Sequence, residues 1–203
     1  MRISTLSFFS VLVSFSAVAG VDISRDEFKM YQHYRNALAD PRVQKMKETV
    51  RMAAIAKDAG FKLKDLERAV QRGEGLGDLK AACEGAIREA LGATELKARI
   101  AKVDVDTQSP HAVAYVEWLN ENPTASQLAT EASWAAHAVM VGCPMISSIQ
   151  VWAGEATNVS ARVFQGLISA SAAANIKPER IKDFAETRYL RLFEKVTLPT
   201  AAP

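Results

Sequence analysis

The stretch ARIAKVDVD, residues 98–106, is where the pattern of apolar residues along this chain changes. Ala101, Val103 and Val105 alternate there with one lysine and two aspartates. A two-residue period of this kind is typical of a β-strand with one buried face, because successive side chains point to opposite sides of a strand. The stretch therefore predicts a strand inside a chain whose other segments favour helices.

The segment after this strand allows two interpretations. TQSP, residues 107–110, is typical of a turn, and HAVAYVEWL, residues 111–119, is rich in β-branched and aromatic residues. One interpretation is a β-hairpin near residues 99–118. The other begins a helix at Ser109-Pro110 and continues it over residues 110–120. A lone hairpin would have to pack on helices, because an isolated two-stranded ribbon is only marginally stable.

Helix signals dominate the remaining sequence. Capping boxes at Ser24 and Thr124 and the Asp40-Pro41 pair are typical of helix starts, and Gly60 is typical of a helix end. Residues 145–154 are apolar without a clear period. The expected helices cover about residues 24–38, 41–59, 62–72, 78–91, 124–141, 160–174 and 178–196. The sequence thus predicts a mainly α protein, a single-domain bundle of about seven or eight helices, with or without one β-hairpin near 99–118.

The first residues have the organisation of a secretory signal peptide. Arg2 precedes an apolar stretch, Leu6 to Val18, and Ala17-Val18-Ala19 is an A-x-A cleavage site. The apolar stretch is short and rich in serine, whereas a membrane span needs about 20 apolar residues. We therefore expect residues 1–19 to be a signal peptide, 22–198 a single helical domain and 199–203 a loose tail. The mature protein would be periplasmic or secreted, without a stable membrane anchor.

The two cysteines are expected to form a disulfide. Cys143 follows a glycine at a predicted helix C-terminus, where the helix dipole disfavours a thiolate, so it is poorly placed to act as a nucleophile. In an oxidising compartment an even number of cysteines favours pairing. A Cys83–Cys143 disulfide would close a loop of about 60 residues, and the chain-entropy estimate of its contribution to stability is about 4 kcal/mol.

The helix predicted at 124–141 carries the candidate ligand-binding residues. Ser126, Thr130, Ser133 and His137 are spaced four, three and four residues apart, so they form one polar stripe. The second half of this helix is otherwise apolar, which predicts burial. A histidine in such a place is most often a structural residue bonded to a neighbouring group. The stripe is nevertheless the candidate ligand site, with a pocket expected near His137.

Several functions are disfavoured by what the sequence lacks. It contains none of the usual zinc, calcium, haem, phosphate-loop or serine-hydrolase motifs, so we predict no metal and no cofactor. Removing residues 1–19 would take one basic residue, Arg2, from 25 basic and 23 acidic residues, which leaves a net charge of +1. This balance argues against a nucleic-acid partner.

These observations favour an exported, non-enzymatic interaction, adaptor or assembly protein whose partner is another envelope or secreted protein. Homo-oligomerisation is compatible with the sequence. One alternative is a small-molecule carrier with a pocket near His137. The other is a hydrolase with an unfamiliar site that uses His137, His111 or the pair Asp104 and Asp106. Alternating acids on a strand are, however, most often its solvated face.

Thiol counting tests the predicted disulfide. Under denaturing, non-reducing conditions the mature protein is expected to show no free thiol, because Cys83 and Cys143 are its only cysteines. The same sample after reduction should show two. Two free thiols before reduction would contradict the pairing.

Overall fold

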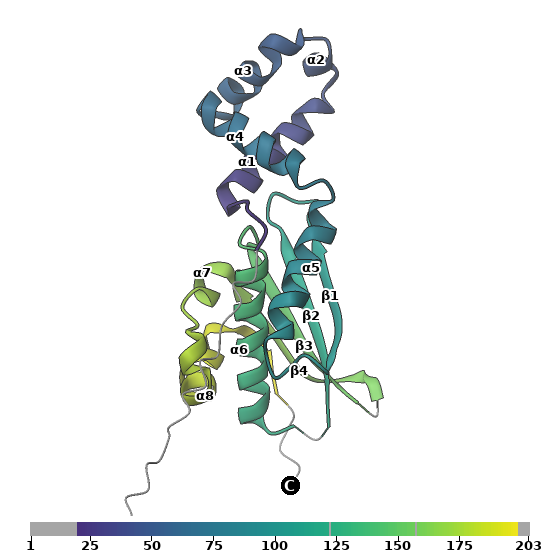
Figure 1. Ribbon diagram of the computed structural model, residues 1–203, viewed down its shortest axis with the longest axis vertical. Helices are drawn as coiled ribbons and strands as arrows, with labels where there is room; N and C mark the ends of the chain where they lie inside the picture. The colour runs from purple at the N-terminus through teal and green to yellow at the C-terminus, as the bar shows by residue number, and fades with distance from the viewer. Residues whose placement is uncertain (1–19, 122, 157, 199–203) are drawn as a thin grey trace, which may run out of the picture.

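The computed structural model describes residues 20–121, 123–156 and 158–198, without the side chains of 158–161. The predicted signal peptide, 1–19, and tail, 199–203, lie outside this range. The strands are β1 (Ile100–Asp106), β2 (Val113–Asn120), β3 (Ser148–Glu155), β4 (Asn158–Ser169) and β5 (Glu194–Thr197). They form one mixed sheet in the order β1-β2-β3-β4-β5 (Figure 1). β2 and β3 are parallel, and the other neighbours are antiparallel.

This sheet makes the molecule an α/β protein, so the predicted mainly α bundle of seven or eight helices is wrong. The predicted hairpin near 99–118 does form, as β1 and β2. The rival helix over 110–120 is therefore excluded. The hairpin is only the first part of a larger sheet, because β2 also pairs with β3 along its whole length.

The largest errors concern the last third of the chain. Residues 160–174 were predicted as a helix, but they form β4 up to Ser169 and only then the short helix α7 (Ala170–Ala173). Phe164 and Ile168 are buried on one face of β4, while Val163 and Leu167 are partly exposed on the other. Apolar side chains on both faces hide the two-residue period of a strand.

The final predicted helix, 178–196, is also wrong as a single element. It is divided into η1 (Pro178–Arg180), α8 (Ile181–Phe184), the π-helix η2 (Ala185–Tyr189) and η3 (Leu190–Leu192), and it ends in β5. Phe193 leaves the helical conformation and packs its ring against Phe164, with 6.3 Å between the ring centroids. This contact places the following residues beside β4.

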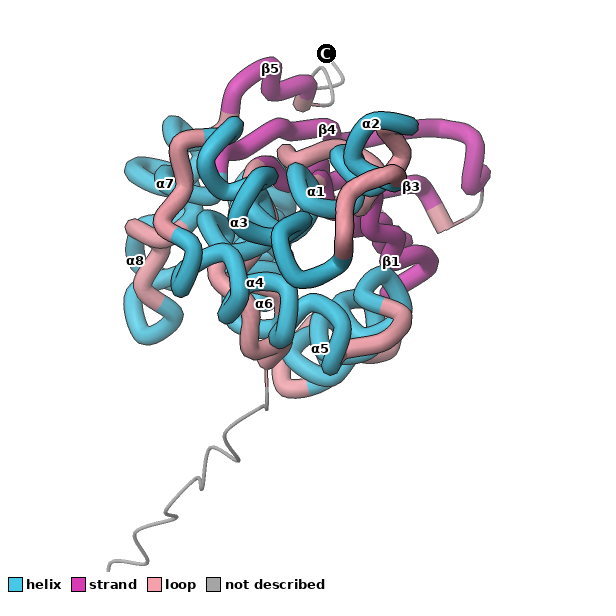
Figure 2. Tube along the Cα trace, turned by 90° about the horizontal axis from the view of Figure 1, so that it is seen from above, coloured by secondary structure: helices cyan, strands magenta, loops and turns pink. Residues whose placement is uncertain are grey.

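Two long helices cover one face of the sheet (Figures 1 and 2). These are α5 (Leu79–Gly92) and α6 (Ala125–Gly142), and α6 is the crossover that joins the parallel strands β2 and β3. Parallel neighbours need a connection of this kind, because the chain must return to the same end of the sheet. The core between the two layers includes Val116, Trp118, Val151 and Phe164, none of which is exposed.

The disulfide Cys83–Cys143 is present, as predicted. It joins α5 to the residue that follows α6, with 5.2 Å between the Cα atoms, and both side chains are fully buried. The bond therefore connects the two helices that cover the sheet. A disulfide is compatible with an oxidising compartment. Within the described part of the chain, no helix is both long and apolar enough to cross a membrane.

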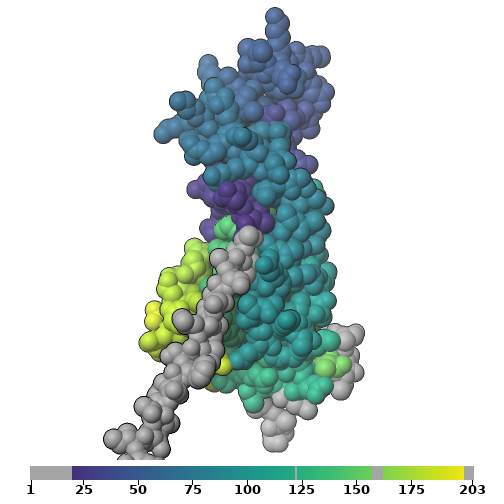
Figure 3. All heavy atoms as spheres, in the orientation of Figure 1, coloured from purple at the N-terminus to yellow at the C-terminus, as the bar shows by residue number. Residues whose placement is uncertain are grey.

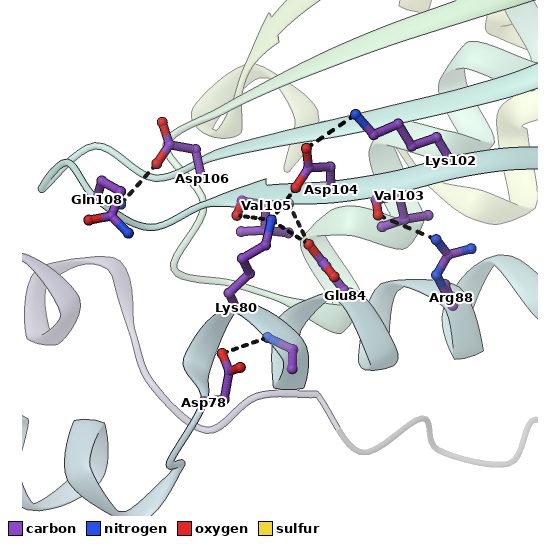
Figure 4. A network of polar contacts seen from close by, with 11 residues as sticks. Asp78, Lys80, Glu84, Arg88, Lys102, Val103, Asp104, Val105, Asp106 and Gln108 are labelled. Atoms are coloured by element: carbon purple, nitrogen blue, oxygen red, sulfur yellow. Dashed lines mark hydrogen bonds and ion pairs between the residues drawn. The ribbon is translucent and has the colours of Figure 1, made fainter.

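Side chains of α5 cover the free edge of β1 (Figure 4). Lys80 Nζ donates to the Val105 carbonyl at 3.1 Å, and the Val105 N–H donates to Glu84 Oε1 at 3.1 Å. One helical turn further on, Arg88 donates to the Val103 carbonyl at 3.4 Å. These bonds satisfy backbone groups that an exposed edge strand would offer to another chain.

The first four helices form an arm that projects from one end of the sheet (Figures 1 and 3). They are α1 (Arg25–Leu38), α2 (Pro41–Gln44), α3 (Glu48–Ala59) and α4 (Leu63–Gly75). The arm has a small core of its own around Tyr31, Ile55 and Leu66. Gln32 Nε2 donates to the Thr107 carbonyl at 2.7 Å and ties α1 to the β1–β2 turn.

A pair of glycine substitutions tests the contact between α5 and α6. A Cβ at Gly142 would lie 2.6 Å from the Ile87 backbone nitrogen, whereas a Cβ at Gly85 meets nothing within 4 Å. We expect Gly142→Ala to lower the free energy of unfolding by about 1–3 kcal/mol. Gly85→Ala, in the middle of α5, should raise it by up to about 1 kcal/mol, because alanine favours a helix over the unfolded chain.

Urea unfolding followed by circular dichroism measures both variants. Equal stability of Gly142→Ala and the unchanged protein would contradict the close packing of the two helices.

Candidate functional site

The predicted polar stripe lies on α6, but most of its hydroxyl groups bond within the helix itself. Ser133 is fully buried and donates to the Ala129 carbonyl at 2.7 Å. Thr130 donates to the Ser126 carbonyl at 2.9 Å. The role of the stripe in ligand binding stays a prediction, because these bonds use two of its four side chains.

His137 is half-buried next to the C-terminal segment. Its ring meets Trp134 edge-on, with 6.4 Å between the centroids. Burial lowers the pKa of His137, while the charge of Glu179 acts to raise this pKa and that of Lys177 acts to lower it further. Because burial is the largest of these effects, the imidazole is mainly neutral at neutral pH.

Asp104 and Asp106, the acidic pair of the hydrolase alternative, contact different residues (Figure 4). Asp104 forms ion pairs with Lys80 and with Lys102, the latter at 3.3 Å. Asp106 instead accepts a bond from the Gln108 N–H at 2.9 Å. His111 is exposed in the turn between β1 and β2, and His137 lies on α6, so the candidates of this alternative do not share one site.

A buried carboxylate that was not predicted from the sequence, Glu131, lies in the first half of α6. Glu131 is 3% exposed and accepts four hydrogen bonds. The donors are Arg99 at 2.6 Å, Trp118 Nε1 at 2.7 Å, Asn120 at 2.6 Å and Gln127 at 3.1 Å. A fully bonded buried charge of this kind holds α6 against the ends of β1 and β2. The signal in the sequence was a lone acidic residue in an apolar helix.

The face of the sheet opposite the helices is the candidate functional site. Along β2 and β3, buried residues alternate with partly exposed ones, and the buried set faces α5 and α6. Helices α5 and α6 both lie on the side of the buried residues (Figure 2). The partly exposed residues therefore form an open sheet face.

Two aromatic rings stack at the centre of this open sheet face. Tyr115 of β2 and Trp152 of β3 have ring centroids 5.7 Å apart and planes that differ by 6°. The Arg162 guanidinium of β4 lies over the Trp152 ring, 5.0 Å from its centroid. Cation–π contact and stacking hold the three side chains as one ordered unit.

The Trp152 indole also has an unused hydrogen-bond donor. Its Nε1 is buried, and no acceptor lies within reach among the described residues. Trp118, on the opposite face, shows the usual arrangement, because its Nε1 donates to Glu131. Trp134 Nε1 on α6 is buried without a partner in the same way, so this free donor does not distinguish the open sheet face.

Charges of both signs surround the aromatic pair. Lys102 is the neighbour of Glu117, Asp104 is the neighbour of Tyr115, and Glu117 is the neighbour of Trp152. With Arg162 included, this surface carries two basic and two acidic side chains. Such a mixture suits a protein surface with its own mixed charges and does not suit a polyanion, which requires a basic face.

The architecture and this site define a two-layer α/β protein with a helical arm and one open sheet face. In comparisons with known proteins, no family model, no curated protein and no solved structure matched the chain. Within residues 20–121, 123–156 and 158–198, no group of three or more histidine, cysteine or acidic side chains could hold a metal ion.

The pKa of Asp104 tests the ion-pair network. Its hydrogen bond with Lys80 lowers this pKa from 3.8 to about 2, with Lys102 contributing further. Because the folded-state pKa is depressed, the stabilisation by Asp104 is present above pH 4 and is lost as the pH falls through about 2. Carboxyl-carbon NMR should show this low midpoint, and Lys80→Gln should raise it towards the ordinary value.

Lys182→Gln is the matched control for this measurement. Lys182 pairs with Glu95 at 2.7 Å and should leave the Asp104 titration unchanged. An ordinary aspartate pKa in the unchanged protein would contradict the network.

Proposed function

We propose that this chain is an exported, non-enzymatic interaction protein that binds another envelope or secreted protein through the open sheet face. The observation that carries the proposal is the ordered unit of Tyr115, Trp152 and Arg162. Tyrosine, tryptophan and arginine are the residues that most often dominate the energy of protein interfaces. Here they lie together on a face that the helices of the protein leave open.

The rigidity of the unit supports a role in binding. Side chains that are ordered before association lose less conformational entropy when a partner binds. Tyr115 and Trp152 are held by each other, and Arg162 is held by the Trp152 ring.

Two features support an exported location. The N-terminal 19 residues have the organisation of a signal peptide, and the disulfide Cys83–Cys143 suits an oxidising compartment. The proposal therefore places the partner in the periplasm or outside the cell, where this chain would act as an adaptor or assembly factor.

Site-specific photo-crosslinking in the organism that encodes the protein tests this function. The crosslinker replaces Gln165, which is exposed on β4 beside Trp152, or Glu89, which is exposed on α5. We expect position 165 to form an adduct with one other protein, because it borders the aromatic unit. Position 89 should form no adduct with that protein, because it lies on the helix-covered side.

The purified partner then allows a matched comparison. Trp152→Ala should weaken its binding at least about tenfold, as expected for a hot-spot residue. Trp134→Ala removes another partly buried tryptophan, from α6 on the helix side, and should leave binding unchanged. Arg162→Gln changes an exposed side chain and should leave the fold intact. Weaker binding by this variant would therefore come from a lost contact with the partner and not from unfolding. Adducts only with copies of this chain, or equal effects of both tryptophan variants, would contradict the proposal.

A further inference from the structure

A hollow of about 330 Å³ lies in the C-terminal segment, on the side of the molecule away from the open sheet face. It is lined by Asn175 and Lys177, just before η1, and by residues of η1, α8, η2 and η3, in the segment that packs along α6 (Figure 1). Its volume falls within the range of small-molecule sites, about 300–1,000 Å³. The predicted stripe from Ser126 to His137 does not line it, although Lys177 of its rim acts on the charge of His137.

The rim of this hollow is basic. Lys177, Arg180 and Arg188 line it, and no acidic side chain does. Within the described part of the chain, Lys177 and Arg188 form no ion pair, and Arg180 reaches Asp183 only at 4.0 Å. At the hollow beside β1 and β2, by contrast, the basic side chain Arg99 is paired with Glu131 at 2.6 Å.

The floor of the hollow is aromatic and apolar. Phe184 and Tyr189 meet edge-on with 6.4 Å between their ring centroids, and Leu192 adjoins them. The Arg180 guanidinium lies over Phe184, 4.8 Å from its ring centroid. This stacking orients the guanidinium without using its hydrogen-bond donors.

Tyr189 adds a buried polar group to the floor. Tyr189 is only 2% exposed, and its hydroxyl oxygen accepts a hydrogen bond from the Lys177 backbone N–H at 3.1 Å. The structure gives this hydroxyl proton no acceptor among the described residues. The proton is therefore free for a ligand oxygen, and the bond to Lys177 fixes the position of the hydroxyl.

The backbone at this place is unusual as well. Arg188 and Tyr189 belong to η2, the π-helix Ala185–Tyr189. π-helices are rare and occur frequently at functional sites. In this protein the wide turn coincides with the residues that line the hollow.

We propose that this hollow binds a small anion of phosphate or carboxylate type that carries a ring or a short apolar group. The anionic group lies among Lys177, Arg180 and Arg188 and accepts a hydrogen bond from Tyr189. The apolar group lies on Phe184 and Leu192. Charge-assisted hydrogen bonds from arginine forks favour both phosphate and carboxylate oxygens. The site is independent of the open sheet face and of its partner.

Calorimetric titration of the full mature chain at low salt tests this site, with phenyl phosphate and benzoate as probes. At least one of the two should bind, with an affinity that falls as salt is added. Inorganic phosphate and benzyl alcohol, which each lack half of the expected chemistry, should bind at least about tenfold more weakly.

Variants locate the binding. Arg188→Gln and Lys177→Gln are each expected to weaken binding of the anionic probe about tenfold, because each removes a charged donor from an exposed rim without disturbing the core. Arg191→Gln is the matched control, since Arg191 is an exposed arginine of the same segment that does not line the hollow. Tyr189→Phe should weaken binding while retaining the ring.

The outcomes separate the possible sources of the ligand. Binding of phenyl phosphate in solution identifies a soluble ligand, whereas binding only to phosphatidylglycerol vesicles, lost in Arg188→Gln, identifies a lipid headgroup. Absence of binding to all of these probes would overturn the proposal. Equal losses in Arg191→Gln and Arg188→Gln, or equal affinity for phenyl phosphate and inorganic phosphate, would also overturn it.

Discussion

The parallel pairing of β2 with β3 is the constraint on which the rest of this structure depends. Eight residue pairs connect the two strands in register, so the chain must travel the length of the sheet between them. It does so as α6, whose inner side is buried from Leu128 to Gly142. Because α6 lies across the sheet centre, α5 can pack beside it and cover the edge of β1. The C-terminal segment packs along its other side.

Three local contacts keep this layered arrangement in place. The Cys83–Cys143 disulfide joins α5 to the end of α6, and Gly142 lets their backbones approach closely. At the opposite end of α6, Glu131 accepts hydrogen bonds from the ends of both hairpin strands. The helices consequently occupy one face of the sheet and leave the other open. The functional proposals follow from this asymmetry, since the aromatic unit lies on the open face and the basic hollow on the helix side.

The candidate site could be predicted only in part. The sequence left residues 111–118 open between a strand and a helix, and only the structure places Tyr115 and Trp118 on opposite faces of β2. Tyr115 becomes part of a site only through Trp152, which lies 37 positions later in the sequence. The two rings become neighbours only because their strands pair. Arg162 arrives through a second pairing, between β3 and β4. The basic hollow was not predicted, because a regular helix over 178–196 would place Arg180 and Arg188 on one stripe but about 12 Å apart along its axis, and not around one hollow.

The sequence by itself determined the local features: the caps at Ser24, Asp40 and Thr124, the strand at 101–106, and the pairing of the only two cysteines. Each depends on chemistry within a few residues or on a simple count. Only the tertiary structure decided that residues 148–155 and 158–169 are strands and that the sheet has an open face. Those segments carry apolar residues on both faces, so their local pattern fits a helix as well as a strand. Hydrogen bonds to distant strands select between the two, and no local period records them.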